Sequence, residues 1–270
     1  MTRQANPAPL TEAPMNHLPH ITRRAVLATP LLMTACQLTP TPNPQGPQGP
    51  QLDQQAVAFD LPGHSRPVRT WVALPEGYAA GTQAWPLVVF LHGSGERGSD
   101  LDRVKFHGPP KHVAAGRRYP FILCSPQLDA GSWKPDTLHA LRAALQARYR
   151  VDPQGITATG LSLGGHGVWH WAAAYPADLA AIAPVCGFGN PARVCQARQV
   201  PVRAYHGSAD DVVPLARQQA CVDALRACGG QAEFIVYPDV GHNAWDPAYE
   251  DAALVPWLMA QRSAPAQASS

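Results

Sequence analysis

Gly160-Leu161-Ser162-Leu163-Gly164 decides the fold of this chain, because Gly-x-Ser-x-Gly between a strand and a helix is the pattern of a sharp turn that exposes a serine. Side chains two positions before and after that serine would collide with the neighbouring strand and helix, and glycine removes them. Residues 155–159, just before the turn, are short and β-branched, as in a buried strand. After the turn, apolar residues recur at helical spacing until Pro176. The sequence therefore predicts a strand, a turn that projects Ser162, and a helix, in that order.

Two segments offer backbone N–H groups that could hold a developing negative charge. The amide of Leu163 lies at the predicted helix N-terminus, where N–H groups lack intrahelical partners and the helix dipole favours an anion. Residues 87–98 read Leu-Val-Val-Phe-Leu-His-Gly-Ser-Gly-Glu-Arg-Gly, a buried strand followed by a glycine-rich loop of the kind that supplies a second such donor. We predict an oxyanion hole made by the N–H groups of Ser94 and Leu163, with Gly95 as the alternative to Ser94. Within this loop we expect Glu96 and Arg97 to form a bracing ion pair.

An acid and a base follow at the ends of later strands. Asp210, in Tyr-His-Gly-Ser-Ala-Asp-Asp-Val-Val-Pro, is a candidate to accept a hydrogen bond from an imidazole, whereas Asp211 is expected to cap or orient the next helix. His242 lies on a short loop after the last predicted strand. The order Ser162, Asp210, His242 is the chain order of the catalytic triads on this kind of sheet. The sequence thus predicts nucleophilic catalysis by Ser162, with His242 as base and Asp210 as its partner.

Apolar runs alternate with helical patterns, which favours an α/β fold: a largely parallel sheet covered by helices on both faces. Function gathers at the carboxyl ends of the strands in such sheets, and the motifs above all fall there. The predicted strands are residues 68–74, 87–91, 121–125, 156–159, 180–185, 202–205 and 232–237, and the predicted helices are residues 136–149, 163–174, 215–227 and 248–261.

These motifs together resemble a known family. The quoted stretches are Leu91 to Gly98, Val151-Asp152-Pro153, Thr159 to Gly165, Tyr175-Pro176, Pro184 to Gly187 and Gly241 to Trp245. They are similar to bacterial α/β-hydrolase esterases of the carboxylesterase, polyhydroxybutyrate-depolymerase-like or predicted-peptidase group, over roughly residues 68–260. The resemblance implies the same triad and the same oxyanion amides. Leu163 stands where methionine is frequent in that group, a change that leaves the chemistry intact.

The expected substrate is a small-molecule or polymer ester, and we expect Trp133 and Trp245 to line its acyl or alcohol site, because flat apolar rings suit an aromatic or sugar group. An ester is favoured over an amide because nothing in the sequence indicates a second domain or a charged pocket for a peptide. Two alternatives remain open. One is a serine peptidase or aminoacyl amidase of the prolyl-oligopeptidase-like type, and the other is a non-catalytic, lipid-anchored binding module. We expect no cofactor, and no cysteine or histidine spacing indicates a metal site.

Residues 1–35 have the pattern of an export signal. Arg23-Arg24 precede a short apolar segment, as in twin-arginine signals, and Met33-Thr34-Ala35-Cys36 resembles a lipoprotein processing box. We therefore expect a protein of the cell envelope that is lipid-anchored at Cys36, or one that is secreted. Residues 36–51 are a proline-rich tether, residues 52–262 the α/β-hydrolase domain, and residues 263–270 a disordered tail.

Charge and cysteine content limit the partners further. Three arginines and one glutamate of the 21 basic and 19 acidic residues lie in the first 35 positions, so the remainder has no formal net charge and gives no support to nucleic acid as a partner. Beyond Cys36 there are five cysteines, and an odd number leaves at least one unpaired. Cys186 and Cys195 flank a predicted loop and are the candidate disulfide. Cys221 and Cys228 lie about 10 Å apart along a predicted helix, too far for one.

Overall fold

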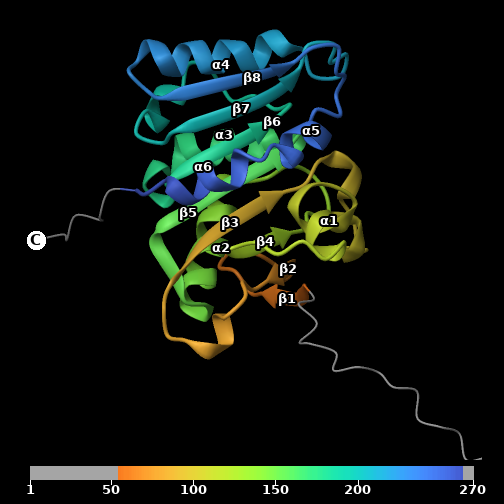
Figure 1. Ribbon diagram of the computed structural model, residues 1–270, viewed down its shortest axis with the longest axis vertical. Coiled ribbons are helices and arrows are strands. Elements are labelled where there is room, and N and C mark those ends of the chain that lie inside the picture. Colours follow the sequence, from red (N-terminus) through yellow and green to blue (C-terminus); the bar gives the residue numbers. More distant parts are fainter. Residues whose placement is uncertain (1–53, 264–270) are drawn as a thin grey trace, which may run out of the picture. The chain divides into compact units, whose positions relative to one another are not determined.

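The computed structural model of the protein describes residues 54–263, which are built around an eight-stranded sheet. The strand order is β1-β2-β4-β3-β5-β6-β7-β8 (Figure 1). Strands β3 to β8 run parallel, whereas β2 pairs antiparallel with both β1 and β4. The strands are β1 (Gln55–Phe59), β2 (Val68–Ala73), β3 (Trp85–Leu91), β4 (Ile122–Pro126), β5 (Val151–Leu161), β6 (Ala181–Val185), β7 (Val202–Gly207) and β8 (Ala232–Tyr237).

Helices cover both faces of the sheet, as near-continuous apolar strands require. On one face, α2 (Pro135–Arg148), α3 (Leu163–Ala174) and α4 (Leu215–Ala227) bury residues in a core with Leu87, Ile156 and other strand residues. On the other face, α5 (Trp245–Glu250) and α6 (Leu254–Ala260) bury residues in a second core around Val88 and Phe90 (Figure 1). Helix α1 (Gly108–Ala114) packs at the edge of this second core. Short 3₁₀ turns η1 to η5 complete the described chain: Tyr78–Ala80, Ser94–Glu96, Leu101–Phe106, Pro176–Asp178 and Val194–Ala197.

The predicted fold class is confirmed, and each predicted strand is present. Two elements were missed. Strand β1 lies at the sheet edge and exposes most of its side chains, so it lacks the apolar run by which a buried strand is recognised. Helix α1 begins Gly-Pro-Pro, a sequence typical of a turn, although proline is well tolerated in the first turn of a helix.

The single helix predicted over residues 248–261 is wrong, because the structure has two short helices, α5 and α6, with Asp251 extended between them. Pro256 explains the break. It has no N–H to donate to Ala252, and its ring would collide with the carbonyl of that residue in a continuous helix. Just before the second helix, the side chain of Asp251 accepts a hydrogen bond from the amide of Ala253 at 2.9 Å, as in an Asx turn.

The predicted Cys186–Cys195 disulfide is also wrong. Cys195 pairs with Cys228, with Cα atoms 5.9 Å apart, because η5 packs against the C-terminal end of α4. Cys186 instead lies fully buried at the end of β6, and Cys221 does not pair with Cys228, as their separation along the helix predicted. The predicted lipidation site Cys36, the export signal and the tether lie outside the described residues.

A buried acid ties the helices of one face together. Asp178 is 6% exposed, accepts hydrogen bonds from Trp171 Nε1 and His139 Nδ1 at 2.8 Å each, and pairs with Arg142 Nε at 2.9 Å. These contacts join α2 to the segment that follows α3.

Within residues 54–263, none of the helices is long and apolar enough to cross a membrane.

Candidate active site

Ser162 stands at the turn between β5 and α3 with a left-handed backbone, φ 50° and ψ −113°. Its amide donates to Val185 O at 2.9 Å, which fixes the turn to the end of β6. A Cβ atom on Gly164 would lie 1.9 Å from Leu91 O, and one on Gly160 would lie 2.6 Å from the carbonyl carbon of Gly164. The two glycines are therefore required by the close packing of β5, β3 and the first turn of α3. This strained serine is the nucleophile-elbow geometry that the sequence predicts.

The structure brings the three predicted triad residues into one hydrogen-bonded chain. The Ser162 hydroxyl lies 2.9 Å from Nε2 of His242, and Nδ1 of His242 lies 2.8 Å from Oδ2 of Asp210. Because an ionised carboxylate can only accept, Nδ1 carries the proton and Nε2 is free to accept from the serine. This tautomer is the one a general base needs.

Asp210 is held in its ionised form by donors around it. Its Oδ1 accepts from the amides of Val212 and Val213 at 3.0 and 2.8 Å, while Oδ2 faces His242. Burial on its own would raise the pKa of Asp210, but the hydrogen bonds from His242, Val213 and Val212 outweigh it, so the pKa lies below its ordinary value. An ionised Asp210 can stabilise positive charge on His242.

The loop that carries His242 approaches β7 very closely. A Cβ atom on Gly207 would lie 2.1 Å from Val240 O and 2.4 Å from Gly241 O. The amide of Ala209 donates to the same Val240 oxygen at 2.9 Å. Glycine at 207 therefore lets the loop after β8 cross the end of β7 and bring His242 onto Asp210.

The predicted oxyanion loop lies beside the elbow. Ser94 begins η2, and a Cβ atom on the preceding Gly93 would lie 2.7 Å from Cδ1 of Leu161, the residue before the serine. Leu163 is the first residue of α3, so its amide is one of the donors without an intrahelical partner. The structure thus places both predicted donors at the same end of β3 and β5 as the serine.

His92, at the end of β3, supports this loop from beneath. It is fully buried, and burial lowers its pKa to about 4, so it is neutral. Its Nδ1–H donates to Gly93 O at 2.6 Å, and its Nε2 accepts from the amide of Leu128 at 3.0 Å. Trp133 donates to His92 O at 3.1 Å and packs edge-on to the imidazole. The loop is therefore held by neutral hydrogen bonds.

The predicted Glu96–Arg97 ion pair is wrong, because the two side chains point apart. Arg97 donates to Ser94 O and Gly131 O, at 3.0 Å each. Glu96 is buried, and its Oε1 lies 3.7 Å from Nε2 of His107. Arg97 still braces the loop, but through backbone carbonyls.

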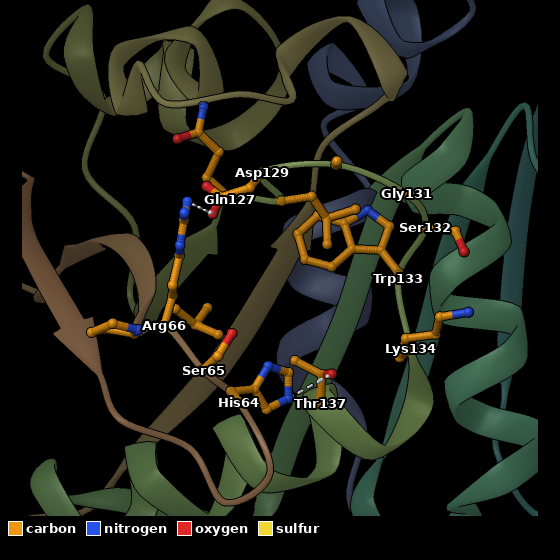
Figure 2. A pocket seen from close by; sticks show the side chains of 14 residues that line it. His64, Ser65, Arg66, Gln127, Asp129, Gly131, Ser132, Trp133, Lys134 and Thr137 are labelled. Carbon is orange, nitrogen blue, oxygen red and sulfur yellow. Dashed lines mark hydrogen bonds and ion pairs between the residues drawn. The ribbon is translucent and has the colours of Figure 1, made fainter.

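Trp133, predicted to line the substrate site, is 5% exposed and packs against Gly167 of α3. Its remaining surface borders a cavity of about 320 Å³ between residues 64–68 and residues 127–137 (Figure 2). In that view His64 and Thr137, joined by a 3.0 Å hydrogen bond, lie across the cavity from Asp129. None of the three triad residues lines this cavity.

Trp245, the second predicted substrate residue, lies next to the base. Its ring packs edge-on against the imidazole of His242, with centroids 5.2 Å apart at 85°. The same ring also packs near His107, with ring centroids 5.3 Å apart. The position of Trp245 is thus compatible with a substrate contact, whereas that of Trp133 favours support of the loop.

Cys186 also lies against the triad. Its Sγ donates to His242 O at 3.1 Å, and Sγ, an Asp210 oxygen and a His242 nitrogen lie within 4.8 Å of one another. Burial raises the pKa of the Cys186 thiol well above its ordinary value, which disfavours the thiolate that a metal ligand requires. Since Asp210 and His242 are also engaged with each other, we interpret this group as part of the triad's support.

The strand order, the elbow after β5 and the acid and base after β7 and β8 define an α/β-hydrolase fold. The model of the Dienelactone hydrolase family matches residues 129–255. A putative carboxymethylenebutenolidase from Methylorubrum extorquens is 30% identical over 118 residues, which cover 39% of this chain and 39% of that protein. The chain thus spans about two fifths of the length of this curated relative.

Two solved structures share the fold. A thermostable esterase is 26% identical with a TM-score of 0.68, covering 78% of this chain and 64% of that one. A ferulic acid esterase is 16% identical with a TM-score of 0.60, covering 77% of this chain and 98% of that one.

Proposed function

We propose that the protein is a serine esterase that cleaves carboxylic esters through an acyl-enzyme. The observation that carries this proposal is the hydrogen-bonded chain from Ser162 through His242 to Asp210, with the serine on a strained turn. The partial match to a hydrolase family and the likeness to an esterase structure support an ester substrate.

In the first half of the reaction, Nε2 of His242 takes the proton of the Ser162 hydroxyl as Oγ attacks the ester carbonyl carbon. Asp210 stabilises the imidazolium that forms. The amides of Ser94 and Leu163 donate to the oxyanion of the tetrahedral intermediate, and each such donor contributes about 3 kcal/mol to lowering the barrier. The intermediate collapses when the bond to the alcohol oxygen breaks and His242 gives its proton to that oxygen.

In the second half, water replaces the alcohol. His242 takes a proton from water, the hydroxide oxygen attacks the acyl carbon of the ester to Ser162, and the same two amides hold the second oxyanion. When the carbon–Oγ bond breaks, the proton returns to Ser162 and the carboxylic acid leaves. Within this scheme we assign Trp245 to the substrate site. We assign Trp133 to the support of the loop that carries Ser94, behind the substrate site, through its hydrogen bond to His92 O.

Ser162→Ala tests the proposal against short p-nitrophenyl esters, with Ser132→Ala as a matched control because Ser132 borders the separate cavity. We expect hydrolysis and labelling by a fluorophosphonate to disappear in the first variant and to persist in the second. Undiminished hydrolysis by Ser162→Ala would exclude Ser162 as the nucleophile. A wild-type protein that neither labels nor hydrolyses any ester would favour the binding-module alternative.

We further propose that the protein is an exported esterase of the cell envelope, anchored through a lipid on Cys36. Support comes from the arginine pair, the apolar segment and the processing box before Cys36. The intact mass of protein extracted from membranes should equal that of the chain from Cys36 plus the whole attached lipid, and Cys36→Ala should release the protein from the membrane. An unmodified mature chain with a different N-terminus would contradict the anchor.

A further inference from the structure

His206 is a buried histidine that the mechanism above does not use. It lies on β7, four residues before Asp210, and its side chain is fully buried. Its ring contacts three groups. Nδ1 lies 2.5 Å from Oε1 of Gln218, while Nε2 lies 2.9 Å from Val213 O and 3.2 Å from Oδ2 of Asp210.

The positions of the hydrogen atoms in this cluster follow from the two backbone carbonyls at its ends, those of Pro184 and Val213. Gln218 is itself fully buried, and its Nε2 donates to Pro184 O at 3.2 Å. A carbonyl oxygen only accepts, so the amide nitrogen of Gln218 must face Pro184 and the amide oxygen must face His206. Turning the amide over would set two oxygens against each other.

Both ring nitrogens of His206 therefore face acceptors. Nδ1 faces the oxygen of Gln218, and Nε2 faces the oxygens of Val213 and Asp210. A neutral imidazole has one N–H and would direct a lone pair at one of these oxygens inside a fully buried cluster, where the repulsion is costly. We propose that His206 is an imidazolium ion-paired with Asp210, and that it positions the triad carboxylate for His242.

The surroundings of His206 provide one negative charge, on Asp210, that can balance a positive charge on its ring. Among the described residues, Asp210 is the charged group within ion-pair distance, Gln218 of α4 is neutral, and the neighbour on β8 is the ring of Phe234, 6.5 Å away and edge-on. A buried cation needs such a carboxylate and full hydrogen bonding, and His206 has both. Its protonation follows from geometry alone and does not depend on the proposed function.

The consequence for catalysis rests on the proposed function. Oδ2 of Asp210 lies 3.2 Å from His206 and 2.8 Å from His242, so the two imidazoles share one carboxylate oxygen and their nearest nitrogens are at most about 6 Å apart. His206 contacts Oδ2 of this carboxylate, whereas the backbone amides of Val212 and Val213 donate to Oδ1. Its charge also opposes a second positive charge on His242, since both imidazoles lie against the same carboxylate oxygen.

The protonation state can be tested directly in the wild-type protein. Histidine labelled with ¹⁵N is observed by NMR through the couplings between ring nitrogens and carbon-bound protons. We expect one histidine to have both ring nitrogens protonated at pH 7.5 and to give an N–H signal protected from exchange, and its signal to be missing in His206→Gln. If no histidine of the folded protein is doubly protonated at that pH, the proposal is wrong. This outcome does not depend on the variant folding.

The positioning role is tested by the pH profile of kcat/KM for His206→Gln, with His64→Gln as the matched control because His64 borders the separate cavity. Without the charge at 206, a proton on His242 is less opposed, so we expect the acid limb to move to higher pH by about one unit. The maximum kcat should fall about tenfold with little change in KM. An unmoved acid limb in a folded His206→Gln variant would overturn the positioning role of His206. A wild-type protein that does not react with the fluorophosphonate would instead overturn the proposed function.

If His206→Gln does not fold, His206→Asn provides the second variant, because its amide can still donate to one of the two acceptors. We expect the same direction of shift. A downward or absent shift in this variant would again contradict the positioning role.

Discussion

Gly207→Ala tests whether the close approach of the loop after β8 to the end of β7 sets the position of His242. In Gly207→Ala the new Cβ would lie 2.1 Å from Val240 O, whereas real Cβ contacts essentially never fall below 3.0 Å. The loop after β8 must therefore move by about 1 Å, because the end of β7 is held in the sheet. His242 follows Val240 by two residues and moves with it. A misplacement of that size costs about 100-fold in rate, so we expect kcat to fall about 100-fold.

The assay is hydrolysis of p-nitrophenyl acetate, together with the rate of fluorophosphonate labelling and the Tm. Both rates should fall in parallel, since each depends on the bond between Ser162 and His242, while the variant stays folded. Gly81→Ala is the matched control, because nothing lies within 4 Å of its Cβ position and its backbone φ is −135°. It should keep wild-type rates.

A Gly207→Ala variant with wild-type kcat would refute this reasoning, since the loop would then tolerate the displacement or avoid it. A variant that loses activity only in proportion to its unfolded fraction would show that Gly207 serves stability and not the position of His242.

Other expectations follow from the same structure. Asp210→Asn should lower kcat by about 10³- to 10⁴-fold, because His242 loses the carboxylate that sets its tautomer and stabilises its charge. The pKa of Asp210 is lowered in the folded protein. Ionised Asp210 therefore stabilises the fold above the unfolded pKa of about 3.9, and this stabilisation is lost as the pH falls through the folded pKa. The Tm difference between wild type and Asp210→Asn should accordingly be present at pH 6 and vanish on acidification. Replacing Cys195 and Cys228 by serine opens a loop with a separation of 33 residues and should cost about 3 to 4 kcal/mol of unfolding free energy in urea titrations, whereas an unchanged midpoint would show that the pair is not bonded. Asp178→Asn should lower the unfolding free energy by about 3 kcal/mol with kcat per folded molecule unchanged, since it breaks a buried pair far from the serine.

The elements of the fold could be predicted wherever local preference and burial agree. Strands β3 to β8 are mostly rich in apolar residues, and α3 follows a turn whose glycines allow the close packing it needs, so residues a few positions apart carry the information. Strand β1 is stabilised by pairing with β2, and α1 by packing on the second core. Those contacts come from segments far away in the chain, so the local sequence does not reveal them.

The sequence by itself determined that Ser162 stands on an elbow and that an acid and a base follow at the ends of later parallel strands. Parallel strands end at one edge of the sheet, and this geometry is enough to expect Ser162, Asp210 and His242 to meet. Only the tertiary structure decided how the other side chains pair. Glu96 turns from Arg97 toward His107, Cys195 pairs with Cys228, and His206 joins Asp210. These outcomes depend on contacts between segments brought together by strand register and helix packing, which position along the chain does not specify.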